Sequence, residues 1–136
     1  MTKPLPADFV EQFEEQFNCW NRGDLEAILA VYDPDVDYRP LRAPIQGAYA
    51  GHAGIREWWA DTEENFAAFR LEAEEIRDIG DERVLAAGKL HVRGKGSGVE
   101  ASVPSASLIA FRDGLIVALK DYGDREKARE AAGLSD

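Results

Sequence analysis

The hydrophobic pattern of the chain changes its period near Arg70, and this change constrains the fold more than any other feature. Before Arg70, apolar residues recur every three or four positions, which is typical of helices that bury one face. After it, the period approaches two, which is typical of strands. The expected helices cover residues 6–22, 24–32, 55–69 and 125–132, and the expected strands cover 36–39, 70–79, 83–93, 99–112 and 115–122. Helices gathered early and strands gathered late indicate an α+β fold.

In such a fold, helices pack on the concave face of a curved, mixed or antiparallel sheet. The result is a cone-shaped domain that encloses a pocket between sheet and helices. Its walls would come from aromatic residues of the helical segments and the first strand, of which only some would face a pocket while the rest fill the core. These candidates are Phe9, Phe13, Phe17, Trp20, Tyr32, Tyr38, Trp58 and Trp59.

Composition limits the partners of the chain. It has 136 residues, 45% of them hydrophobic, which fits a single domain, 1–136, with a sizeable core. A net charge of −10 argues against nucleic acid and anionic membranes as partners. The lone cysteine, Cys19, excludes an intrachain disulfide, and no stretch approaches the about 20 apolar residues of a membrane span. We therefore expect a cytoplasmic protein in which Cys19 is buried as a small hydrophobe.

The dipeptide Asp113-Gly114 predicts a hairpin between the last two strands, because glycine accepts the positive φ of a tight turn. If Arg112 joins these two in a three-residue loop, Phe111 faces Leu115 across the ladder. Odd-numbered positions then share the inner face of the sheet, and this face is apolar except at its far end.

At that far end an acid, Asp121, meets two hydroxyls, Ser105 and Ser107. A carboxylate in a partly apolar cavity would have a raised pKa and could act as a general acid or base. Alternatively, Asp121 accepts hydrogen bonds from the turn before the last helix, or points outward. Pro104 predicts a bulge or an edge position in the same strand.

His91 permits two interpretations. It lies between Lys89 and Arg93, which favours a polar outer surface or a dimer contact. It also shares its parity with Leu85 and Ala87, which leaves a ligand-facing histidine open.

Arg39 and Arg42 flank Pro40 near the expected mouth of the cavity. Either could bind an anionic group of a ligand, and the alternative is an ion pair with Asp35 or Asp37. The two histidines lie far apart, and no His-Glu or Cys pairs have ligand spacing, so no metal site is expected.

Three segments resemble the SnoaL-like family of the nuclear-transport-factor-2-like superfamily. They are Trp20–Ala27, Tyr49–Arg56 and Phe111–Ile116, and the resemblance covers roughly residues 7–134. It implies a cone-shaped α+β domain and a homodimer packed through the outer face of the sheet. It does not fix the chemistry, because this superfamily includes cyclases, isomerases, dehydratases, hydrolases and plain binding modules.

The catalytic residues of the family transfer only in part. SnoaL-type cyclases place an acid/base aspartate where Asp121 stands, and often a histidine where Ser107 stands. Ketosteroid isomerase has its aspartate base at the place of Arg39 and its oxyanion tyrosine at or near Gln16. The chain therefore keeps the cyclase carboxylate and lacks the other groups.

Two functions follow. The first is a cofactor-free isomerase, cyclase or dehydratase that acts on an apolar carbonyl or ring-bearing substrate through Asp121, with the substrate oriented by Tyr38 or by the hydroxyl of Ser105 or Ser107. The second is a binding or dimerisation module without turnover. The outer-face dimer is also suggested by even-numbered residues such as Ile116 and Ala118, which would need cover.

Overall fold

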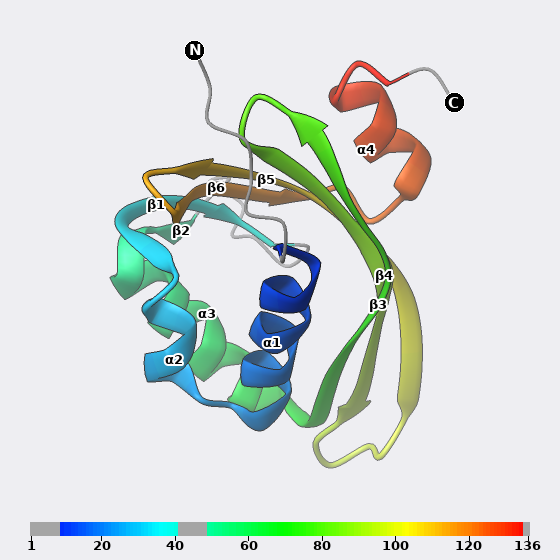
Figure 1. Ribbon diagram of the computed structural model, residues 1–136. Helices are drawn as coiled ribbons and strands as arrows, with labels where there is room; N and C mark the ends of the chain where they lie inside the picture. The colour runs from blue at the N-terminus through cyan, green and yellow to red at the C-terminus, as the bar shows by residue number, and fades with distance from the viewer. Residues whose placement is uncertain (1–8, 41–48, 135–136) are drawn as a thin grey trace.

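The computed structural model describes residues 9–40 and 49–134 (Figure 1). The helices are α1 (Phe9–Arg22), α2 (Leu25–Leu29), α3 (Gly51–Asn65) and α4 (Arg125–Ala131). The strands are β1 (Tyr32–Arg39), β2 (Tyr49–Ala50), β3 (Phe66–Gly80), β4 (Arg83–Gly94), β5 (Glu100–Arg112) and β6 (Leu115–Asp121). The loop predicted over 41–50 and Arg42, one of the two arginines expected near the mouth of the cavity, lies outside the described residues.

The strands form one curved sheet in the order β2-β1-β6-β5-β4-β3. The pair β1–β6 is parallel and every other pair is antiparallel. Helices α1, α2 and α3 lie on the concave side, and α4 lies outside it (Figure 1). The predicted α+β cone with a mixed sheet is confirmed.

Two predicted helix ends are wrong. Helix α2 ends at Leu29, so Tyr32 begins β1 and is not part of the helix. Helix α3 ends at Asn65, and Phe66 and Phe69 belong to β3. A spacing of three suits a helix, but pairing of β3 with β4 from Gly94 onward overrides this local preference.

The β5–β6 hairpin turns in two residues, not three. Both Asp113 and Gly114 have positive φ, 54° and 81°, so Phe111 pairs with Ile116 and the prediction that it faces Leu115 is wrong. A bulge at Val117 then restores the predicted parity further along the strands.

As a consequence, Ile116 faces the core with 1% exposure, so it does not need cover from a second copy. Beyond the bulge, Ser107 pairs with Asp121 and Ile109 with Leu119.

Helix α4 covers an apolar strip on the convex side of the sheet. Its Ala128 is fully buried against Leu85, Ala87 and Ala106. Asp124 caps the helix by accepting hydrogen bonds from two backbone N–H groups of its first turn. Part of the outer face expected to bind a partner copy is therefore occupied by the chain's own helix.

The pairing of β3 with β4 contains three register shifts that the sequence did not indicate. One of them lies between Ala73 and Glu75, opposite Gly88. A Cβ on Gly88 would overlap the carbonyl oxygen of Glu72, so glycine allows the close approach. Pro104 pairs with Lys89 without a shift in a part of β5 that has no β6 partner, so its edge position is confirmed and a bulge is not.

Candidate functional site

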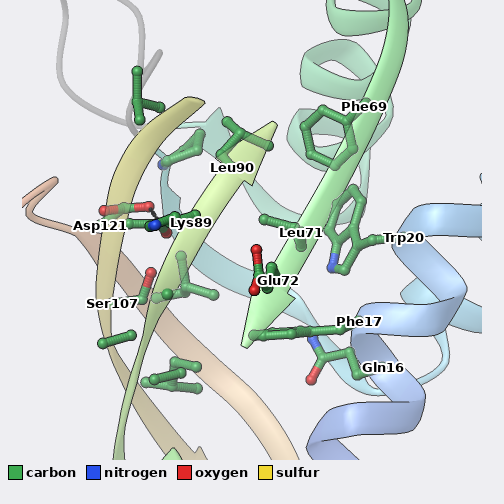
Figure 2. A pocket seen from close by; sticks show the side chains of 18 of the residues that line it. Gln16, Phe17, Trp20, Phe69, Leu71, Glu72, Lys89, Leu90, Ser107 and Asp121 are labelled. Atoms are coloured by element: carbon green, nitrogen blue, oxygen red, sulfur yellow. Dashed lines mark hydrogen bonds between the residues drawn. The ribbon is translucent and has the colours of Figure 1, made fainter. Parts of the chain in front are cut away.

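A cavity of about 300 Å³ lies between the concave face of the sheet and helices α1 and α3 (Figure 2). Its wall is overwhelmingly apolar, and its volume suits a small organic molecule. The apolar lining includes Phe17, Trp20, Tyr32, Tyr38, Pro40, Trp58, Phe66, Phe69, Leu71, Leu90, Val92, Val103, Ile109 and Leu119.

The aromatic part of this wall is held by ring contacts between α1, α3 and β1. The ring of Trp58 lies edge-on to Trp20 at 5.4 Å and to Tyr38 at 5.6 Å between centroids. Trp20 and Tyr38 are nearly parallel, with an interplanar angle of 8°. Such contacts fix the rings in place, so this wall is preorganised before any ligand binds.

Asp121 lies at the β5–β6 side of the cavity (Figure 2). Its Oδ2 accepts a hydrogen bond of 2.7 Å from Ser105 Oγ. Its Oδ1 accepts hydrogen bonds from the backbone N–H groups of Gly123 at 2.7 Å and Ala106 at 3.2 Å. Both interpretations of this acid are therefore partly correct, because it lines the cavity and also bonds to the turn before α4.

Burial raises the pKa of the Asp121 carboxyl above its ordinary value of 3.8. The hydrogen bonds from Ser105, Gly123, Ala106 and Ser107 oppose that rise. A half-buried carboxylate whose pKa moves towards neutrality is suited to exchange a proton with a bound molecule.

A second polar group lies across the cavity on α1 (Figure 2). Gln16 lines the cavity, and its side-chain N–H donates a hydrogen bond of 2.9 Å to Tyr32 Oη. Burial raises the pKa of both Tyr32 and Tyr38, so each phenol keeps its proton near neutral pH. Gln16 was not among the predicted ligand-binding residues, although its helical spacing to Phe13 and Trp20 places it on the buried stripe.

Six predicted site residues come together in this cavity: Trp20, Tyr32, Tyr38, Ser105, Ser107 and Asp121. Three others lie elsewhere. Trp59 is 7% exposed and packs behind the wall against Trp20 and Phe69. Arg39 pairs with Asp37 at 3.0 Å between Nε and Oδ1, which is the predicted alternative of an ion pair.

His91 is the third residue outside the cavity. Residues of its parity, Leu85 and Ala87, lie under α4 on the convex side, so the shared parity does not bring His91 to the ligand. Its Nδ1 lies 2.6 Å from Ser102 Oγ, and its Nε2 lies 2.7 Å from Glu72 Oε1. This outer-face contact lowers the pKa of the Glu72 carboxyl.

Within residues 9–40 and 49–134, no group of three or more His, Cys, Asp or Glu side chains is arranged to hold a metal ion. The same part of the chain contains no helix long and apolar enough to span a membrane. Cys19 is buried at 7% exposure, as expected.

Comparison with known proteins supports the fold. Residues 13–119 match the family described as the SnoaL-like domain. No curated protein matches the chain. Among solved structures, an NTF2-like protein of unknown function from Burkholderia pseudomallei superposes with a TM-score of 0.75 and 21% identity, covering 92% of this chain and 97% of that one.

Two further structures were solved with small molecules present. TerC, co-crystallised with polyporic acid, has a TM-score of 0.72 and 24% identity, over 91% of this chain and 97% of that one. A Catenulispora acidiphila protein with a ketosteroid isomerase-like fold, in complex with trimethylamine, has a TM-score of 0.69 and 19% identity, over 88% and 89%. At these identities the likeness establishes the fold and not the ligand.

Proposed function

The chain belongs to the SnoaL-like domain family, and on that premise we propose that it binds a small, apolar, ring-bearing carbonyl compound and moves a proton on it through Asp121. The observation that carries this proposal is a half-buried carboxylate with a raised pKa in the wall of a largely apolar cavity. The cavity wall supplies shape and apolar contact, and Asp121 supplies the proton acceptor.

The reaction needs no cofactor. Asp121 takes a proton from the carbon next to the carbonyl group, and the electron pair of that C–H bond moves into the carbonyl to form an enolate. Where a carbon–carbon double bond adjoins the enolate, the carboxylic acid returns the proton to the far carbon of the conjugated system, which is an isomerisation. Where a hydroxyl stands β to the carbonyl, the acid protonates it as it departs as water, which is a dehydration. Attack of the enolate on a second carbonyl of the substrate gives cyclisation, and the alkoxide formed takes the proton from Asp121. Tyr38 or a serine hydroxyl would orient the substrate.

One observation favours the alternative, a binding module without turnover. Asp121 receives two backbone hydrogen bonds, from Ala106 and Gly123, and so also stabilises the junction of β6 with the following turn. Arg39 and Gln16 stand where ketosteroid isomerase has its aspartate base and its oxyanion tyrosine, and they cannot replace that pair.

Exchange of deuterium into a ring ketone separates these functions. With 1-tetralone in D₂O, the wild type should accelerate loss of the α-proton NMR signal, and Asp121→Asn should reduce that rate by about 10²–10⁴-fold. Asp37→Asn is the matched control, because Asp37 is an acid paired with Arg39 outside the cavity. Thermal stabilisation by 1-tetralone or polyporic acid without exchange would favour the binding module. Absence of both stabilisation and exchange would contradict the proposal.

We further propose a cytoplasmic homodimer joined through the part of the convex sheet face that α4 leaves uncovered. This face includes Arg83, Ala110, Ala118 and Lys120, which border a shallow groove. Light scattering should give about twice 15.1 kDa, and a mass near 15.1 kDa would contradict the dimer.

A further inference from the structure

A hydrogen-bonded row of three side chains lies on the convex face of the sheet, outside the cavity. His91 on β4 stands directly opposite Ser102 on β5, and its Nδ1 lies 2.6 Å from Ser102 Oγ. On its other side, His91 Nε2 lies 2.7 Å from Oε1 of Glu72 on β3. A hydroxyl, an imidazole and a carboxylate are therefore aligned across three neighbouring strands.

The direction of these two hydrogen bonds follows from the groups themselves. The bond to His91 lowers the pKa of the Glu72 carboxyl, so near neutral pH Glu72 is a carboxylate and can only accept. The His91 Nε2–H group must then donate to it. In a neutral imidazole this leaves Nδ1 without a proton, and Nδ1 accepts the hydrogen bond from the Ser102 O–H group. The imidazole is thus oriented as a general base towards the serine hydroxyl.

These three side chains are accessible from solution. Ser102 is exposed, and the side chains of His91 and Glu72 are 27% and 44% exposed. Along β4, helix α4 covers Leu85 and Ala87, which lie between His91 and the groove proposed above for the dimer. A dimer joined through that groove would leave Ser102 accessible.

The strand edge beside Ser102 offers a backbone donor. The N–H group of Ala106 donates to Asp121 Oδ1 and its carbonyl oxygen accepts from Tyr122 N–H, so both groups point away from β4. Because this direction repeats every second residue and β4 pairs with β5 without a shift, the Ser102 N–H group points the same way. Among the described strands, β6 borders this edge only from Ser107 onward. The Ser102 N–H group can therefore donate to an oxygen of a molecule bound at its hydroxyl.

We propose that Ser102, His91 and Glu72 form a second site that hydrolyses small carboxylic esters, independently of the cavity and of Asp121. Ser102 Oγ attacks the ester carbonyl carbon while His91 Nδ1 takes the hydroxyl proton, and the π electron pair of the carbonyl moves to its oxygen. The Ser102 N–H group donates to that oxyanion. The C=O bond then re-forms, the C–O bond to the alcohol breaks, and His91 gives its proton to the departing alcohol.

Water completes the cycle at the same three side chains. His91 Nδ1 takes a proton from a water molecule as its oxygen attacks the acyl carbon, and the bond to Ser102 Oγ breaks. His91 returns the proton to Ser102, and a carboxylic acid leaves. Glu72 is a positioning residue, because its carboxylate holds Nδ1 towards Ser102 and stabilises the imidazolium that forms in each half of the cycle.

The test uses p-nitrophenyl acetate as substrate and a fluorophosphonate as a serine-directed label. In the wild type the fluorophosphonate should lose fluoride and form a P–O bond to Ser102 Oγ, identified by peptide mass spectrometry. His91→Gln should slow both the labelling and the ester hydrolysis about 10²-fold. Glu72→Gln should lower kcat without raising KM. Ser97→Ala is the matched control and should equal the wild type, because Ser97 is an exposed serine of the β4–β5 hairpin whose Oγ accepts from Val99 N–H.

Labelling of the unaltered protein guards against misfolding of the variants, and urea unfolding curves show whether each variant is folded. Absence of the label from Ser102 in the wild type would overturn this inference. Equal rates of p-nitrophenyl acetate hydrolysis in the wild type and Ser102→Ala would also overturn it. Neither result bears on the function proposed for the cavity, which deuterium exchange into 1-tetralone measures separately.

Discussion

Two carboxylates on the same sheet meet opposite surroundings. Asp121, at the end of β6, lines the cavity, and burial raises its pKa. Glu72, on β3, also borders the cavity, but its side chain is 44% exposed, and the hydrogen bond to His91 lowers the pKa of its carboxyl. Because the Glu72 side chain reaches water and its carboxylate is hydrogen-bonded to His91, its charged form is favoured. In the cavity the same charge is maintained against desolvation, which is the usual sign of a functional acid.

The same contrast extends from these two carboxylates to the concave wall and the charged part of the outer face of the sheet. The concave wall is made of aromatic rings that contact one another and leave a cavity. The outer face carries partly exposed ion pairs, such as Arg125 with Glu74 and Lys89 with Glu74. Ligand binding should therefore depend on the concave face, and the exposed ion pairs of the outer face should contribute little to stability.

The largest expected effect comes from the aromatic wall. Trp20→Ala removes a ring that contacts Tyr38, Trp58 and Trp59, and should lower the free energy of unfolding by about 3–5 kcal/mol. His91→Ala, on the outer face, should cost much less. Urea denaturation measures both, and comparable losses would contradict the contrast between the two faces.

A smaller effect is expected for Asp121→Asn on stability. Because the folded pKa of Asp121 is raised above 3.8, its charged form is disfavoured in the folded state. The wild type should therefore lose stability relative to Asp121→Asn as pH rises from 3.8 through the folded pKa, and the two should converge at lower pH. Unfolding curves recorded across this range would contradict the account if the difference grew on acidification instead.

The smallest effect is expected for Glu72→Gln, with the opposite sign. The folded pKa of Glu72 lies below 4.5, so its contribution is present above pH 4.5 and is lost as pH falls through the folded pKa. Because this group is exposed, salt should weaken the effect further. A parallel set of unfolding curves in low and high salt measures it, and a wild type less stable than Glu72→Gln at neutral pH would contradict the assignment.

The sequence predicted what depends on periodicity and missed what depends on long-range pairing. The cone followed from the order of helices and strands. The inward Asp121 and the serines beside it followed from strand parity, which a bulge at Val117 preserved despite a wrong turn length. His91 was ambiguous because parity fixes which residues share a face but not which face a helix covers. Trp58 and Trp59 are neighbours on one helix, and only tertiary packing decides that Trp58 lines the cavity.

The central claim is that the Asp121 carboxylate faces an apolar cavity. A ¹³C NMR titration of its side-chain carboxyl, assigned with Asp121→Asn, tests this most directly. The account predicts a midpoint above the ordinary value of 3.8, moving further when 1-tetralone displaces water from the cavity. A midpoint at or below 3.8 that does not change when 1-tetralone is added would contradict this claim.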